Sequence, residues 1–320
     1  MSQHNVNAFF GGYNCRLHFR AARPVEKCIR FCKVTEMIRS FQMSKLNPEY
    51  LFKDKDRHNP SALSDYDTLD FVSSDQHIYG EIMWPSSNIE KPHPCVIMLH
   101  GFPGTARNDD ISHALCRIGC VVIVPHNRGA WGSEGKYTIT HCIEDAQNLA
   151  EYAHSKEFTQ KYDVDESKIF LLGHSMGANS ALNAGRKLEW IAGIIMLTPY
   201  DPTRYLNRNK ESYFRSLLEE GKILQSDGID AIYEDVVINK DEISHPASFE
   251  QVKDKNLLVF GGIYDSVSPI NEMILPLWQK LEAHKTSALQ KRVEYPTEHG
   301  LLGRRICVIK EIAEFIDRVI

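Results

Sequence analysis

The chain has 320 residues, 42% of them hydrophobic and 25% charged, a balance typical of a globular protein that excludes a disordered, collagen-like or coiled-coil chain. The net charge of −5 gives no general attraction to nucleic acid. The longest apolar runs, 95–99, 120–124 and 191–197, are far shorter than the roughly 20 residues that a membrane-spanning helix requires. We therefore expect neither a membrane span nor a nucleic-acid partner.

The start of the chain differs from the rest in charge. The first 50 residues hold eight Lys and Arg against three Asp and Glu. They lack the apolar core of a secretory signal, so an organellar presequence and an over-called start, with Met43 as the true first residue, both stay open. Residues 44–66 are rich in Asp, Lys, Asn, Pro and Ser, which is typical of a linker. We predict a basic, flexible extension and linker over 1–66 and a folded domain over 67–320.

The folded domain begins with an alternating pattern. Leu69 and Phe71, and then Ile78 and Ile82, lie on either side of the turn-like Ser-Ser-Asp-Gln, which predicts an antiparallel hairpin at a sheet edge. Short continuous apolar segments follow, and such segments are typical of strands buried on both faces. These segments are 95–99, 120–124, 168–172, 191–197 and 256–260.

Helical patterns alternate with these strands. Ile143 and Ala146 recur at helical spacing in one of them, and Ile309 and Ile312 do so in the last. This alternation predicts an α/β fold with a mostly parallel central sheet and helices on both faces. Residues 200–255, between the sixth and seventh core strands, are longer than a crossover requires. We expect a helical insertion there, which is either a lid over the sheet's carboxyl edge or a surface-packed pair of helices.

The cysteines do not form a recognisable metal motif. The chain has eight cysteines and no Cys-x-x-Cys pair, and two of the cysteines fall inside apparent buried strands. Cys28 with Cys32, and Cys116 with Cys120, are spaced by one helical turn, but no matching His or Cys pair follows downstream. We expect reduced thiols, no metal site and a cytoplasmic location.

The strongest local signal for chemistry is Gly173-His174-Ser175-Met176-Gly177, which follows the strand at 168–172 and precedes a helical pattern. In a nucleophile elbow the serine occupies a strained strand-to-helix turn, and the flanking glycines let the backbone pass close to its neighbours. The strand-to-helix context favours a nucleophilic Ser175 over an ordinary serine that caps a helix.

A serine nucleophile needs a base, and the base needs a carboxylate that orients it. The last expected strand runs into Pro-Thr-Glu-His299, which places a histidine at the same sheet edge as Ser175. Asp265 follows the strand at 256–260, and Asp201 at the end of the preceding strand is a rival acid. We prefer Asp265, because the order Ser, Asp, His is the order in which this kind of elbow presents its partners.

An oxyanion hole requires two backbone N–H groups that point to the developing charge. Met176 supplies one from the turn itself. We expect the other from Phe102, in the glycine-rich loop that follows the strand at 95–99.

Taken together, these motifs resemble those of the α/β-hydrolase superfamily over residues 67–320. Residues 127–135, Asn-Arg-Gly-Ala-Trp-Gly-Ser-Glu-Gly, are similar to the Arg-Gly-x-Gly-x-Ser-x-Gly loop of many esterases, stretched by one residue, so Trp131 either lines the pocket or packs structurally. The resemblance is strongest to small feruloyl-esterase-like and dipeptidyl-aminopeptidase-like serine hydrolases. It implies an acyl-enzyme at Ser175, with Asp265 and His299, and neither a metal nor an organic cofactor.

The substrate is less well specified. We expect a small-molecule carboxylic ester with a small or medium acyl group and a pocket that includes His100, Trp131 and His174. An amide or peptide substrate would use the same three catalytic residues and needs an anchor for an amine, for which Glu219 and Glu220 are candidates. A catalytically silent binding protein is a third reading, which the intact motifs disfavour. Oligomeric state stays open.

Overall fold

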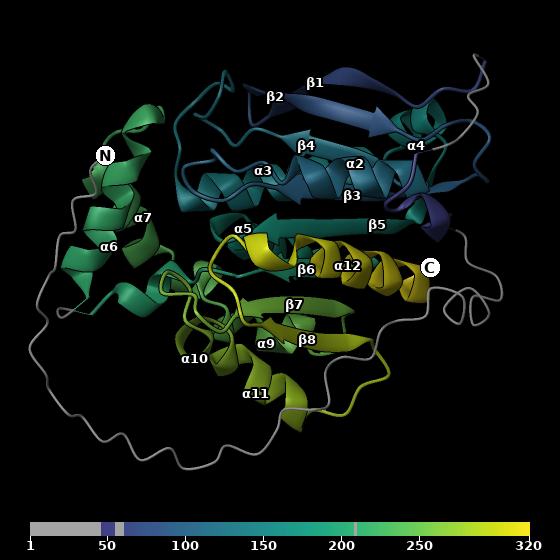
Figure 1. Cartoon of the computed structure of the whole chain (residues 1–320). Helices are drawn as coiled ribbons and strands as arrows, with labels where there is room; N and C mark the ends of the chain where they lie inside the picture. Colours follow the sequence, from purple (N-terminus) through teal and green to yellow (C-terminus); the bar gives the residue numbers. More distant parts are fainter. Residues whose placement is uncertain (1–45, 55–60, 208–209) are drawn as a thin grey trace, which may run out of the picture. The chain divides into compact units, whose positions relative to one another are not determined.

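The computed structural model describes residues 46–54, 61–207 and 210–320 (Figure 1). Within these residues one eight-stranded sheet organises the fold. Its strands are β1 (Asp65–Ser73), β2 (Gln76–Trp84), β3 (His93–Leu99), β4 (Val121–Pro125), β5 (Val164–His174), β6 (Gly193–Leu197), β7 (Leu257–Gly262) and β8 (Gln290–Tyr295).

The strands lie in the order β1-β2-β4-β3-β5-β6-β7-β8. The hairpin β1–β2 is antiparallel and joins the sheet by antiparallel pairing of β2 with β4, while the other neighbouring strands are parallel. Strands β3, β4, β6 and β7 are buried along their whole length, as their continuous apolar sequences predict. The predicted mostly parallel sheet with an antiparallel N-terminal edge is confirmed.

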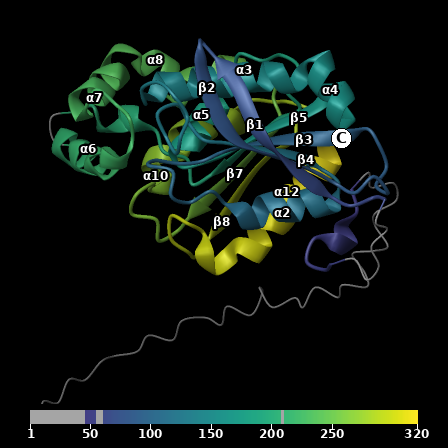
Figure 2. The same cartoon turned by 90° about the horizontal axis from the view of Figure 1, so that it is seen from above.

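Helices cover both faces of this sheet (Figure 2). One face packs against α2 (Asp109–Ile118) and α12 (Arg305–Val319), whose apolar residues join Val96 and Met98 in one core cluster. The other face packs against α3 (Ile139–His154), α5 (Met176–Gly185) and α11 (Leu275–Ala283), together with Ile97 and Leu99. Successive residues of β3 therefore serve opposite cores, as the period of two of a strand requires. The short helices α4 (Lys156–Tyr162) and α10 (Ile270–Met273) precede β5 and α11.

The long connection between β6 and β7 is helical, as the sequence predicts. It packs on the α3 and α5 side: the Asn179 and Asn183 side-chain amides each donate to the Ile243 carbonyl, at 2.8 and 2.9 Å. Asp235 accepts a hydrogen bond from the Thr140 N–H at 3.0 Å. Its elements are η2 (Pro202–Tyr205), α6 (Glu211–Leu218), η3 (Glu219–Ile223), α7 (Ile229–Ile238), α8 (Lys240–Ile243), η4 (Pro246–Ser248) and α9 (Phe249–Val252).

A short segment before the hairpin also packs on the domain, which the sequence analysis did not anticipate. Residues 46–54 include η1 (Pro48–Tyr50), and Leu46 and Leu51 are buried against the α2 side of the sheet. Arg117 of α2 donates to the carbonyls of Tyr50 and Leu51. Packing on the domain therefore begins before Asp67, where we placed its start. Met43, Cys28, Cys32 and most of the basic segment lie outside the described residues.

Candidate active site

The carboxyl ends of four parallel strands bring the predicted site residues to one edge of the sheet. Phe102 lies in the loop after β3, Ser175 follows β5, and Asp265 and His299 follow β7 and β8. In an open α/β sheet this edge is where ligands bind, because the loops that leave parallel strands meet there.

Ser175 lies in a strained turn between β5 and α5. Its φ of 56° and ψ of −117° are uncommon for a residue other than glycine. The turn is fixed on both sides, since the Ser175 N–H donates to the Leu197 carbonyl at 2.9 Å and the Tyr200 N–H donates to the Ser175 carbonyl at 3.1 Å. A Cβ on Gly177 would lie 2.2 Å from the Leu99 oxygen. Glycine at that position therefore allows the turn to pack directly against β3.

His299 and Asp265 form a hydrogen-bonded pair. His299 Nδ1 lies 2.8 Å from Asp265 Oδ2, and because a carboxylate only accepts, Nδ1 carries the proton and donates it. The other Asp265 oxygen accepts the N–H groups of Val267 and Ser268 at 2.9 and 2.8 Å. Burial alone would raise the pKa of the Asp265 carboxyl, but the hydrogen bond and charge of His299 and these two N–H donors hold it below its ordinary value. The pair leaves Nε2 of His299 as the nitrogen able to accept a proton.

The rival acid Asp201 has other partners. One of its oxygens accepts the Thr203 N–H at 3.0 Å and the Thr203 hydroxyl at 2.6 Å. The second accepts the N–H of His245 at 3.0 Å. Asp201 thus caps η2 and ties it to η4, and the carboxylate that the structure places on His299 is Asp265.

The loop that follows β3 packs against the serine turn. A Cβ on Gly101 would lie 3.1 Å from both Ser175 Cβ and the His174 oxygen. The next residue is Phe102, and its N–H and that of Met176 donate no hydrogen bond within the described part of the chain. The N–H groups of both expected oxyanion donors are therefore without an acceptor in this part of the chain, and the residue before Phe102 lies against Ser175.

We expected His100 to line the substrate pocket. Its side chain is instead buried and supports this loop. Its Nε2 accepts the Asn127 N–H at 3.0 Å, and Nδ1 donates to the Gly101 carbonyl at 2.8 Å. Burial lowers the pKa of His100 to about 4, so the ring is neutral at pH 7 and can hold both roles. His100 therefore fixes the loop after β3 to the loop after β4.

Trp131 lies next to the same loop and is 48% exposed. Its Nε1 is 2.7 Å from the point that a Cβ on Gly104 would occupy, so the indole edge lies on the backbone of that glycine. Arg128 anchors the loop at 127–135 to α3, because its buried side chain forms ion pairs with Asp145 and Glu144 of that helix. Among the residues of this loop, Trp131 is thus a half-exposed aromatic group beside the loop that follows β3, whereas Arg128 is structural.

The helical connection between β6 and β7 reaches these loops. The Phe102 ring lies on Gly221 of η3, where an added Cβ would be 2.3 Å from the ring. The Gln225 N–H donates to the Gly129 carbonyl at 2.8 Å, and the Gln225 carbonyl accepts the Tyr137 N–H at 2.7 Å. Contacts of both side-chain and main-chain type therefore join this connection to the loops around Ser175.

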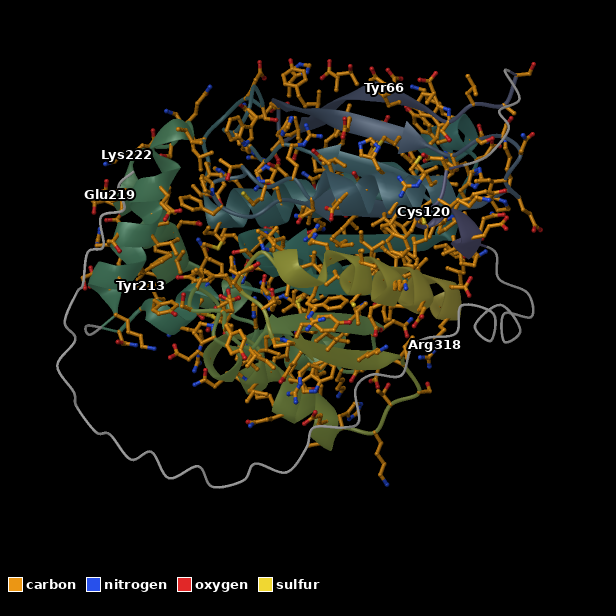
Figure 3. All side chains as sticks on the ribbon, viewed as in Figure 1. Tyr66, Cys120, Tyr213, Glu219, Lys222 and Arg318 are labelled. Atoms are coloured by element: carbon orange, nitrogen blue, oxygen red, sulfur yellow. The ribbon has the colours of Figure 1, made fainter. Side chains whose placement is uncertain are left out.

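The pair Glu219 and Glu220, considered above as an amine anchor, lies on the exposed part of η3. Glu219 forms an ion pair with Lys222, and Figure 3 shows both side chains on the outer side of the helical connection. This position does not favour a role in binding a substrate amine beside Ser175.

Sequence reasoning missed the surroundings of the His299 main chain. The His299 carbonyl oxygen lies 3.1 Å from His174 Nε2 and 2.8 Å from the Thr198 hydroxyl. His174 had been expected to line the pocket, but it is buried and directed to this carbonyl, and Thr198 had not been singled out. A main-chain acceptor leaves no signal in the sequence, so only the fold could reveal these contacts.

In residues 46–54, 61–207 and 210–320 no group of three or more His, Cys, Asp or Glu side chains is placed to hold a metal ion. Cys95, Cys116, Cys120 and Cys142 are buried in the core. No described helix combines the length and the hydropathy needed to cross a membrane.

Solved structures with this fold include many esterases. A bacterial brefeldin A esterase, described as a homologue of human hormone-sensitive lipase, superposes with a TM-score of 0.61 at 15% identity over 84% of this chain and 81% of that one. The esterase of Pyrobaculum calidifontis gives a TM-score of 0.57 at 17% identity over 81% of this chain and 86% of that one. At this level of identity the likeness shows a shared fold.

Sequence relatives point to the same fold family. Monoglyceride lipases of Mus musculus and Rattus norvegicus are each 27% identical to this chain over 146 residues, which is 45% of the chain. The chain thus spans just under half, 46%, of the length of these curated relatives. The family described as having the alpha/beta hydrolase fold matches residues 96–290, more than half of the chain. The chain therefore belongs to the alpha/beta hydrolase fold family.

Proposed function

We propose that the protein is a serine hydrolase that cleaves a carboxylic ester through an acyl-enzyme on Ser175. The observation that carries the proposal is the hydrogen-bonded Asp265–His299 pair at the same sheet edge as a serine held in a left-handed strand-to-helix turn. A buried ionised carboxylate, an oriented imidazole and a serine in this turn are the parts that nucleophilic acyl transfer requires.

In the proposed reaction, His299 Nε2 takes the proton from Ser175 Oγ as Oγ attacks the ester carbonyl carbon. The carbonyl oxygen becomes an oxyanion, which the N–H groups of Phe102 and Met176 stabilise. The C–O bond to the leaving group then breaks, and His299 gives its proton to the departing alkoxide. Water attacks the acyl-enzyme with the same base, and the acid product leaves with Ser175 restored.

Asp265 stabilises the imidazolium that forms in each half of this cycle. Its pKa lies below the ordinary value, so it stays ionised through the pH range in which an imidazole gains and loses a proton. Its second oxygen is held by two N–H donors, which fixes the carboxylate while His299 changes charge.

We place the acyl pocket between Phe102, Trp131 and the helical connection at 200–255, and infer a small or medium acyl group. Support comes from the half-exposed indole beside Gly104 and from the Phe102 ring on Gly221. The names of the sequence and structural relatives, monoglyceride lipase and esterase, favour an ester over an amide. We infer a cytoplasmic enzyme that acts on a small-molecule ester without a cofactor.

Amide or peptide hydrolysis with the same residues is the second candidate. This candidate is less well supported, because Glu219, the expected anchor for a substrate amine, points outward and pairs with Lys222. A silent binding protein would have no need of a strained serine turn beside an oriented imidazole.

The test is turnover of p-nitrophenyl esters from acetate upward, with a feruloyl ester and a dipeptidyl anilide in parallel. We expect ester turnover in the wild type, its loss in Ser175→Ala, and labelling of the wild type alone by a serine-directed fluorophosphonate. Faster cleavage of the anilide would favour the peptidase reading. Unchanged ester turnover in Ser175→Ala, or no labelling of the folded wild type, would refute the proposal.

A further inference from the structure

The main-chain carbonyl of His299 accepts two side-chain hydrogen bonds. One comes from His174 Nε2 at 3.1 Å and the other from the Thr198 hydroxyl at 2.8 Å. His174 is the last residue of β5, and Thr198 directly follows β6, whereas His299 follows β8 at the edge of the sheet. The residue immediately before the proposed nucleophile is therefore bonded to the backbone of the proposed base.

These two hydrogen bonds matter because the side chains of Ser175 and His299 are not hydrogen-bonded to each other. Within the described residues Ser175 Oγ and His299 Nε2 share no hydrogen bond, so the imidazole is not held by the serine it would deprotonate. Asp265 fixes one nitrogen of the ring. The other determinant of the ring position is the backbone of residue 299, which the two donors hold against β5 and β6.

We propose that His174 and Thr198 are positioning residues that set the distance between Ser175 and His299 by anchoring the His299 carbonyl. The inference rests on the function proposed above. Acyl transfer is sensitive to such placement, since a displacement of about 1 Å can cost roughly a hundredfold in rate.

His174 is suited to this role because its ring is buried and neutral. Since a carbonyl only accepts, Nε2 carries the proton, and Nδ1 is buried without a partner within the described residues. Burial and, to a smaller degree, the nearby His299 lower the pKa of His174 to about 4. The two ring centres are 5.0 Å apart, so a charged His174 would oppose the imidazolium that His299 must become. A neutral donor avoids that repulsion.

Thr198 is also held in a fixed position. Its φ is +40°, a strained value for a β-branched residue, and its side chain is fully buried. The Thr198 N–H donates to the Phe260 carbonyl of β7 at 2.9 Å, while the hydroxyl donates to His299. The residue thus links β6, β7 and the His299 loop at one point.

The test compares removal of each donor with its retention. Thr198→Val and His174→Phe keep the approximate shape and lose the donor, whereas Thr198→Ser and His174→Gln keep one. With p-nitrophenyl acetate we expect each donor-removing variant to lower kcat about tenfold, which corresponds to one hydrogen bond, with KM changed by less than about twofold. The conservative variants should recover most of the loss. The matched control is His93→Phe. It replaces a buried histidine at the start of β3, the end of that strand away from the site, and should keep wild-type kcat.

A second readout does not depend on turnover. We expect the Nδ1 proton of His299, which is donated to Asp265, to give a low-field proton NMR signal that broadens or shifts in Thr198→Val and His174→Phe but not in His93→Phe. Unchanged kcat and an unchanged signal in both donor-removing variants would overturn the inference. So would equal losses in the removing and the conservative variants, because that pattern reports lost packing. Failure of the proposed function differs from both, because the wild type itself would then lack Ser175-dependent ester turnover.

Discussion

Acidification should destabilise the folded chain through its buried neutral histidines, and His100 allows the effect to be measured. The pKa of His100 is about 4 in the folded state because the ring is buried, whereas a free imidazole titrates near 6.5. Between these pH values His100 is protonated in the unfolded chain but neutral in the folded chain. The free energy of unfolding therefore falls as the pH drops through this interval. The steepest slope is about 1.4 kcal/mol per pH unit, and the loss from His100 reaches about 3 kcal/mol by pH 4.

The assay is urea unfolding of the wild type and of His100→Gln at several pH values from 7 to 4. We expect the variant to be less stable at pH 7, because it loses bonds to the loops, yet to show a shallower decline below pH 6.5. His77→Gln is a control of opposite sign. Asp70 raises the pKa of His77, so His77 adds stability as the pH falls, and its removal should steepen the decline. Parallel curves for wild type and His100→Gln would refute the reasoning.

Three further substitutions test the site and its support. Asp265→Asn removes the ionised acceptor of the imidazole, and kcat for p-nitrophenyl acetate should fall by roughly a thousandfold or more, while a loss under tenfold would exclude the proposed role. Arg128→Met leaves Asp145 buried without its cation, and the free energy of unfolding from urea titration should fall by about 3 to 5 kcal/mol; a change below about 1 kcal/mol would contradict this. Gly177→Ala would bring a Cβ to 2.2 Å from the Leu99 oxygen, so fluorophosphonate labelling of Ser175 should be lost, and wild-type labelling would show that the turn tolerates a side chain.

The central strands were predictable from the sequence because burial on both faces leaves a simple signal. Continuous apolar runs marked β3, β4, β6 and β7 to within a few residues. The signal fails where a strand extends beyond the core: β5 begins at Val164, ahead of the apolar run at 168–172, because Val164 pairs with His93 and the register with β3 then shifts before Ile169 pairs with Cys95. Leu46 and Leu51 were missed for a related reason, since two apolar residues in a polar segment have no periodicity to detect.

The parts of the site differ in the same way. Ser175 has a local motif, and the order of Asp265 and His299 along the chain agrees with a known arrangement, so these residues could be named in advance. The roles of His100 and His174 could not be named in advance, because each depends on a main-chain partner in the loop that follows another strand. A sequence motif identifies which residues lie at a turn, but it does not identify the hydrogen-bond partners that the fold brings to them.

The contact of Phe102 with Gly221 has a consequence for engineering. The ring adjoins the backbone N–H proposed to stabilise the oxyanion, and Gln225 bonds to the loop that carries Trp131. A chimaera that receives the 200–255 helices of a relative would therefore inherit a new support for both loops along with a new acyl pocket. Selectivity and maximal rate would change together in such chimaeras, so libraries restricted to 200–255 should be screened on both quantities at once.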